Sequence, residues 1–235
     1  MEPIAIFHSP FKSKFGIPRQ SGLVKDLKGT AVFLPKFRNA DAVRGLEQFD
    51  YIWLLWEFSA NRRFKDGSVS CGTDVDSWQP TVRPPRLGGN KSMGVFATRS
   101  PFRPNPIGLS SVRIDFIEKD TPQGPLIHTL GADLMDGTPI LDIKPYIAYA
   151  DSHEEARCGF VDSLEDNVLD VRVPDKYEVL FDSERFEMLR NVLSLDPRPA
   201  YQEDPEKTYG MPFEDYDVHF KVDEGVLTVV DIARR

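Results

Sequence analysis

The sequence predicts a mainly β fold, in which a barrel-like domain is followed by a small α+β domain. Short apolar segments separated by proline- and glycine-rich loops occupy residues 1–150, with little room for helices between them. This pattern favours a closed or nearly closed barrel over a doubly wound sheet, in which helices alternate with strands. Near the end of the chain, alternating apolar and polar residues on both sides of Asp223-Glu224-Gly225 indicate a β-hairpin.

The first part is expected to form several short strands and one short helix. Residues 51–58 are apolar almost throughout, which predicts a central strand buried on both faces. A short helix is expected over residues 40–48. The strands are expected over residues 3–7, 30–34, 51–58, 94–97, 110–117, 125–130 and 139–143.

The composition changes near residue 150, where polar residues 151–157 resemble a linker. Beyond it, Ser183 can cap a helix that places Phe186, Leu189 and Leu193 on one face. Asp196-Pro197 should end that helix, because the residue before a proline avoids helical geometry. The hairpin of residues 216–232 follows. We therefore expect a barrel-like domain over residues 1–150 and a small α+β domain over residues 151–235.

Composition limits the class of protein. The 235 residues contain no run of about 18 apolar residues, so no membrane span is expected. The start, Met1-Glu2-Pro3-Ile4, lacks a basic and then apolar leader, so no secretory signal is expected. Two cysteines and four histidines without zinc-site spacing predict no metal site and suit a reducing compartment. The chain is expected to be cytoplasmic.

Charge is distributed unevenly along the chain. Residues 1–113 carry 17 Lys and Arg against 9 Asp and Glu, a balance of +8. Residues 114–235 carry 12 against 28, a balance of −16, and the two parts sum to the net charge of −8. The basic first half suggests a local anionic ligand such as a nucleic acid, although two solvated faces would give the same pattern.

Common nucleotide and hydrolase motifs are missing from the sequence. No GxGxxG follows a predicted strand, and neither a GxxxxGK[ST] loop nor a GxSxG elbow occurs. A nucleotide-dependent enzyme with this sequence must therefore use an unusual fold.

The proline-rich segment of residues 99–106 carries the most distinctive pattern. Pro101, Pro104 and Pro106 fix the backbone and remove hydrogen-bond donors, so the segment must be a stiff exposed loop. It presents Arg99 and Arg103, and a rigidly held guanidinium is suited to carboxylates and phosphates. The alternative is a structural loop whose arginines cap carbonyl groups or pair with acids.

Residues 94–108, Gly-Val-Phe-Ala-Thr-Arg-Ser-Pro-Phe-Arg-Pro-Asn-Pro-Ile-Gly, resemble the signature of the TsaA-like family, known as tRNA methyltransferase O. Further similar blocks run in the same order along the chain, at residues 18–20, 41–46, 81–90, 136–139, 142–146 and 196–201. The resemblance covers about residues 3 to 201.

The resemblance implies a small antiparallel β-barrel, a methyltransferase of non-Rossmann type, that binds S-adenosylmethionine and forms a homodimer. The implied reaction is N6-methylation of threonylcarbamoyl-adenosine in the anticodon loop of threonine tRNAs. By position, the implied cofactor contacts are Pro18, Arg19, Gln20, Ser59, Ala60, Arg99, Leu109, Asp133, Leu134, Met135 and Asp136. The chain departs from the family at Ser59-Ala60, where a pair containing histidine is often found, and in the polar insert of residues 61–77.

Methyl transfer needs few special groups, because aligning the two reactants supplies much of the rate. A carboxylate such as Asp133 or Asp136 would stabilise a sulfonium, Arg19 or Arg99 would hold a carboxylate, and Gln20 could bind the adenine edge. Resemblance and residue type give three candidates for the proton acceptor, Asp136, Asp196 and Tyr201. The residues expected to contact RNA are Arg83, Arg86, Lys91 and Arg103, with Lys12 and Lys14 as weaker candidates.

Simpler interpretations stay open at this stage. Asp136-Gly137 is also a good hairpin turn, and Asp196-Pro197 could only terminate a helix. Trp53 and Trp56 are more typical of a core than of a base-stacking surface. Two other functions compete: a methyltransferase on the same scaffold acting on a small molecule, and a non-catalytic module binding RNA or the cofactor.

Overall fold

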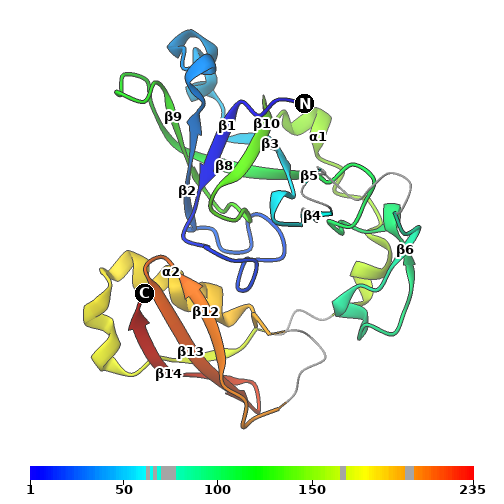
Figure 1. Cartoon of the computed structure of the whole chain (residues 1–235), viewed down its shortest axis with the longest axis vertical. Helices are drawn as coiled ribbons and strands as arrows, with labels where there is room; N and C mark the ends of the chain where they lie inside the picture. Colours follow the sequence, from blue (N-terminus) through cyan, green and yellow to red (C-terminus); the bar gives the residue numbers. More distant parts are fainter. Residues whose placement is uncertain (62–63, 66–67, 70–77, 165–167, 199–203) are drawn as a thin grey trace.

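The computed structural model describes residues 1–61, 64–65, 68–69, 78–164, 168–198 and 204–235 (Figure 1). A barrel occupies the upper part of this view, and a sheet with a helix against it lies below. No helix in the described ranges is long and apolar enough to cross a membrane.

Six antiparallel strands close the barrel, as the sequence predicts. Their order around it is β1-β10-β3-β8-β9-β2, and pairing of β2 with β1 completes the ring. Alternate residues of each strand point inward and pack into one apolar core, which includes Phe7, Ile52 and Ile127. The strands are β1 (Ala5–His8), β2 (Lys28–Phe33), β3 (Tyr51–Glu57), β8 (Ile107–Glu118), β9 (Leu126–Leu130) and β10 (Thr138–Pro145).

Three local expectations are wrong. Strand β3 is not buried on both faces: Ile52 and Leu54 point into the core, whereas Tyr51 is exposed, because a barrel covers only its inner face. The helix expected over residues 40–48 is two short 3-10 helices, Ala40–Val43 and Leu46–Gln48. Gly45, with a left-handed φ of 86°, separates them. The strand expected over residues 94–97 is mostly a 3-10 helix, Val95–Ala97, preceded by β7 (Met93–Gly94).

The segment between β3 and β8 leaves the barrel and returns to it. It carries two short strand pairs, in which β4 (Phe64–Lys65) pairs with β5 (Ser68–Val69) and β6 (Thr81–Val82) pairs with β7. The proline-rich loop lies at the end of this segment, directly before β8. After β10, a single helical turn, α1 (Ala148–Asp151), leads into the second part of the chain.

The second part is a four-stranded sheet of order β11-β14-β13-β12 with helix α2 (Ser183–Ser194). The predicted hairpin is confirmed as β13 (Tyr216–Asp223) and β14 (Val226–Arg234), and β11 (Asp170–Arg172) and β12 (Tyr209–Phe213) flank it. The predicted helix is also confirmed. Its N-cap is Asp182, whose side chain accepts a hydrogen bond from the Arg185 N–H, so the cap lies one residue before the expected Ser183.

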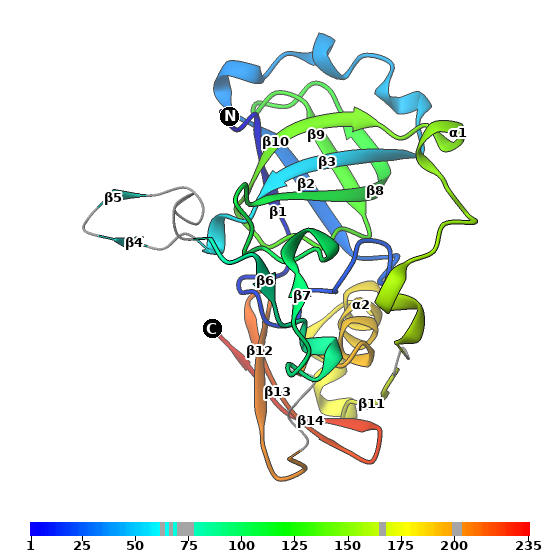
Figure 2. The ribbon, with the colours of Figure 1, turned by 90° about the vertical axis from the view of Figure 1, so that its right-hand side faces the viewer.

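Residues 9–27, here called the N-terminal arm, connect the two parts. Although the arm lies between β1 and β2, its residues Phe11, Val24 and Leu27 are buried in the core that α2 and the second sheet form. The arm hangs from the barrel toward α2 in both ribbon views (Figures 1 and 2). The Glu214 N–H donates to the Pro10 carbonyl at 2.7 Å, which fixes the start of the arm to the end of β12.

Candidate cofactor pocket

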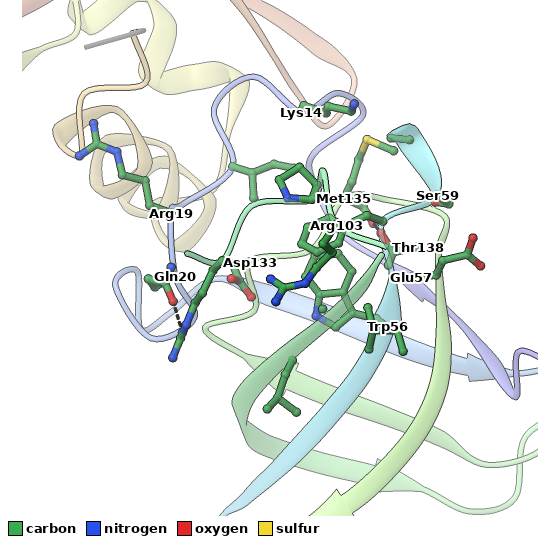
Figure 3. A pocket seen from close by; sticks show the side chains of 18 of the residues that line it. Lys14, Arg19, Gln20, Trp56, Glu57, Ser59, Arg103, Asp133, Met135 and Thr138 are labelled. Carbon is green, nitrogen blue, oxygen red and sulfur yellow. Dashed lines mark hydrogen bonds between the residues drawn. The ribbon is translucent and has the colours of Figure 1, made fainter. Parts of the chain in front are cut away.

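A pocket of about 720 Å³ opens where the N-terminal arm, the end of β3, the proline-rich loop and the start of β8 meet (Figure 3). Its size is within the range of small-molecule sites. It is lined by Lys14, Ile17, Pro18, Arg19, Gln20, Trp53, Trp56, Glu57, Phe58, Ser59, Ala60, Arg99, Pro101, Phe102, Arg103, Asn105, Ile107, Gly108, Leu109, Asp133, Met135 and Thr138.

The proline-rich loop brings two arginines to the pocket, and hydrogen bonds orient both. Arg99 donates to the side-chain oxygen of Gln20, which joins this loop to the N-terminal arm. Arg103 donates from Nη1 to the carbonyl of Thr98 at 3.2 Å. The structural alternative for the loop, in which an arginine caps carbonyl groups, is therefore correct for part of the Arg103 guanidinium. It does not exclude a ligand, since a guanidinium has five N–H donors.

Asp133 supplies a carboxylate to the same pocket (Figure 3). It accepts a hydrogen bond of 2.6 Å from the Ser110 hydroxyl, which itself accepts one of 3.0 Å from the Trp56 indole N–H. Burial raises the pKa of the Asp133 carboxyl above its ordinary value, although the Ser110 hydrogen bond and the charge of Arg99 oppose this rise. Asp133 is thus a desolvated acid in a pocket whose rim is basic.

Apolar surfaces complete the pocket. Trp56 packs edge-on against Phe58, with ring centroids 4.3 Å apart. Phe102 and Leu109 remain 48% and 53% exposed, although each is a large apolar side chain. Such a combination of aromatic walls and a few polar groups is typical of small-molecule binding sites.

Most of the residues predicted to contact a cofactor lie together in this pocket. Pro18, Arg19, Gln20, Ser59, Ala60, Arg99, Leu109, Asp133 and Met135 all line it, although they come from four separate stretches of the chain. Their role in binding a cofactor stays a prediction.

Leu134 and Asp136 do not line the pocket. The Leu134 side chain is fully buried in the barrel core. Asp136 accepts hydrogen bonds from Lys12 Nζ at 2.8 Å and from the Ser9 N–H at 3.2 Å, with His8 Nδ1 at 3.1 Å. Partial burial acts to raise the Asp136 pKa, but these bonds outweigh it, and the pKa is lowered. An anion stabilised in this way is a weak base.

The other two candidates for the proton acceptor belong to the residues that follow α2. Arg198 holds the Asp196 carboxylate with hydrogen bonds of 2.8 and 2.9 Å. Arg19 of the pocket donates to the Asp196 carbonyl at 3.4 Å, so this turn lies at the pocket rim. Tyr201 lies outside the described residues. The helix ends two residues before Asp196, as the simpler interpretation of Asp196-Pro197 expects.

The residues expected to contact RNA are distributed over the segment before β8. Arg83 and Lys91 are exposed, Arg86 is half-buried, and Arg103 lines the pocket. Lys14 also lines the pocket, although the sequence suggested only a weak RNA contact for it. Among the described residues, no group of three or more His, Cys, Asp or Glu side chains could hold a metal ion.

Sequence reasoning missed several pocket residues, among them Trp56, Glu57, Phe58, Phe102 and Thr138. Trp56 was expected in the core, and it is 9% exposed, yet one edge of it also lines the pocket. The end of an apolar strand that leads directly into a polar insert was the available signal, since ligand sites often form at the mouths of barrels.

The fold and the pocket define a ligand-binding β-barrel protein without a doubly wound sheet. The sequence model of the tRNA-methyltransferase O N-terminal domain matches residues 6–152, and that of the family's C-terminal domain matches residues 168–235. The chain therefore belongs to the tRNA methyltransferase O family.

Individual relatives agree with this assignment. A tRNA (adenine(37)-N6)-methyltransferase of Escherichia coli is 41% identical over 245 residues, which cover 100% of this chain and 97% of that protein. A protein of Pyrococcus abyssi named "Probable S-adenosyl-L-methionine-binding protein" is 37% identical over 166 residues, covering 71% of this chain and 76% of that one. A crystal structure of TrmO from Pseudomonas aeruginosa superposes with a TM-score of 0.75 at 32% identity, covering 99% of this chain and 95% of that one.

Proposed function

We propose that this protein is an S-adenosylmethionine-dependent tRNA methyltransferase that methylates N6 of an adenine in the anticodon loop. Family membership over both parts of the chain supports the reaction class. The observation that carries the proposal is the pocket, in which Asp133 and the hydrogen-bonded pair Arg99–Gln20 face the same space.

The residues of the pocket fit the chemical groups of S-adenosylmethionine. Asp133 provides an anion for a cationic group, and Arg19 and Arg99 provide guanidinium donors for a carboxylate. Trp56 and Phe102 provide aromatic surface for an adenine ring. When bound, S-adenosylmethionine supplies a methyl group on a sulfonium.

The protein's own contribution is to bind and align. The Arg99–Gln20 hydrogen bond fixes the proline-rich loop relative to the N-terminal arm, so that both edges of the pocket keep one geometry. Alignment of this kind accounts for much of the rate of a displacement reaction. The identity of a proton acceptor stays a prediction among Asp136, Asp196 and Tyr201.

The proposal extends to the substrate, the assembly and the location. The acceptor would be threonylcarbamoyl-adenosine of threonine tRNAs, bound on the basic surface that contains Arg83, Arg86, Lys91 and Arg103. The protein would act as a cytoplasmic homodimer. The basic balance of residues 1–113 supports an RNA substrate over a small molecule. Light scattering should give twice the chain mass of 26.7 kDa if the dimer forms.

The proposed domain division places a barrel domain at residues 1–150 and an α+β domain at residues 151–235. Two separate apolar cores support it. The N-terminal arm belongs to the first domain by sequence and to the second core by packing.

The first experiment measures transfer of labelled methyl from S-adenosylmethionine to tRNA with and without the threonylcarbamoyl group. Label in the modified pool alone would support both the reaction and its substrate. No label in either pool, despite cofactor binding, would favour a small-molecule acceptor instead.

Arg99→Ala tests the assigned pocket. Removing the guanidinium breaks the link to Gln20 and should weaken cofactor binding about 10- to 100-fold, since a charged hydrogen bond contributes about 1.5–3 kcal/mol. Binding is measured by calorimetry, and circular dichroism checks the fold. Unchanged affinity in a folded variant would remove this pocket from the proposal.

A further inference from the structure

We propose that Ser110 is a positioning residue, which, held by the Trp56 indole, keeps the Asp133 carboxylate aimed into the pocket as the anionic partner of a cationic group of the cofactor. The inference rests on the proposed function and deepens it. It concerns a residue that does not line the pocket itself.

The direction of the hydrogen bonds follows from the chemistry of the three groups. An indole N–H can only donate, and an ionised carboxylate can only accept. The Ser110 oxygen therefore accepts from Trp56 at 3.0 Å, and its single proton is directed to Asp133 at 2.6 Å. With the hydroxyl fixed by Trp56, the chain of bonds favours the ionised form of Asp133 in one orientation.

Packing alone does not explain a serine at position 110. Its side chain lies on the inner face of β8 and is 2% exposed, between the inward positions Gly108 and Val112. A hydroxyl in such a place lowers stability unless it is hydrogen-bonded, and alanine would fill the space without that requirement. Gly108 contributes to the arrangement, because a Cβ there would lie 2.2 Å from the Trp56 ring. The strand thus makes room for the indole that orients Ser110.

Burial works against the charge that the cofactor needs. It raises the Asp133 pKa, and the Ser110 hydroxyl, the Ser21 N–H and the Arg99 charge oppose that rise. The charged groups that line the same pocket are Lys14, Arg19, Glu57, Arg99 and Arg103. Removing the Ser110 donor should therefore shift the Asp133 titration to higher pH, and cofactor affinity should begin to fall at a higher pH as the solution is acidified.

The test is calorimetric titration of S-adenosylmethionine into the full-length protein between pH 4.5 and 7. Ser110→Ala should bind about tenfold more weakly at acidic pH, and the midpoint of the pH dependence should rise by about one unit. In ligand-free protein, the Asp133 carboxyl pKa measured by ¹³C NMR should rise by a similar amount. Thr129→Val is the control, because Thr129 is an equally buried barrel hydroxyl (1% exposed) that donates to the Gly29 carbonyl and does not line the pocket.

A double-mutant cycle separates positioning from general loosening of the barrel. In an Asp133→Asn background, adding Ser110→Ala should change the affinity by less than about twofold, since the group that Ser110 acts on is gone. A loss in Ser110→Ala that is the same at every pH, or that persists in the Asp133→Asn background, would overturn the inference. Wild-type protein that fails to bind S-adenosylmethionine at any pH would overturn the proposed function itself.

Discussion

Burial and charge oppose each other at Asp133. The carboxylate is removed from water, and its pKa is raised, yet it faces a pocket with three arginines. The folded protein therefore binds a proton at Asp133 more tightly than the unfolded chain does. At neutral pH the ionised group lowers the stability of the ligand-free protein, and this cost decreases as the pH falls through the folded pKa toward the ordinary aspartate value.

Asp133→Asn should accordingly make the ligand-free protein more stable while weakening cofactor binding. Without the desolvated charge, the free energy of unfolding at pH 7.5 should rise on the order of 1 kcal/mol, or about 2–4 °C in Tm. The gain should shrink toward zero near pH 4, where the wild-type carboxyl is protonated. Thermal unfolding at both pH values measures it. A variant that is less stable at pH 7.5 and binds S-adenosylmethionine normally would contradict this view.

At the residue scale, the sequence predicted the identity of the pocket residues better than their contacts. The blocks around Gln20 and Arg99 were recognisable, but their hydrogen bond joins residues that are 79 positions apart. Ser110 and Trp56 lie at inward positions of their strands and could not be distinguished from core residues by alternation alone. Only the register of β3 with β8, in which Trp56 is opposite Gly108, brings them together.

At the element scale, β8 and β3 determine the shape of the pocket through their close approach at Gly108. Gly108→Ala places a Cβ against the Trp56 ring, and overpacking of this kind costs about 1–3 kcal/mol. We expect a corresponding loss of thermal stability and weaker cofactor binding, because Trp56 must move into the pocket. Gly94→Ala is the matched control, since nothing lies within 4 Å of its Cβ position. Equal behaviour of the two variants in unfolding and calorimetry would contradict the prediction.

Strands were predictable where alternation was clean and less so where tertiary context permits unusual residues. The barrel strands and the β13–β14 hairpin follow their apolar patterns closely. Strand β12 was missed because it contains Gly210 and Pro212, which disfavour a strand. It is tolerated because β12 is the last strand of its sheet, so the missing N–H of Pro212 interrupts no ladder on the open side.

At the scale of the whole molecule, the uneven charge predicts how tRNA binding responds to salt. Neutralising phosphates releases counterions, so affinity should fall steeply as salt rises, despite the net charge of −8. Arg83→Ala should weaken binding and reduce the slope of log K against log salt by about one. Arg234→Ala, an exposed arginine in the acidic part, should leave both unchanged. Filter binding over a salt series measures the slope, and a flat response would remove RNA from the basic surface.

The path of the N-terminal arm has a consequence for the order of assembly during synthesis. Pro18, Arg19 and Gln20 lie between arm residues whose burial partners are in α2 and the second sheet, and the last of these partners, near Leu227, is about 200 positions after Leu27. At a typical elongation rate, that distance corresponds to about 10–40 s between the emergence of the arm and that of its partners. A nascent chain can therefore begin its barrel early, but its pocket becomes complete only after translation has nearly ended.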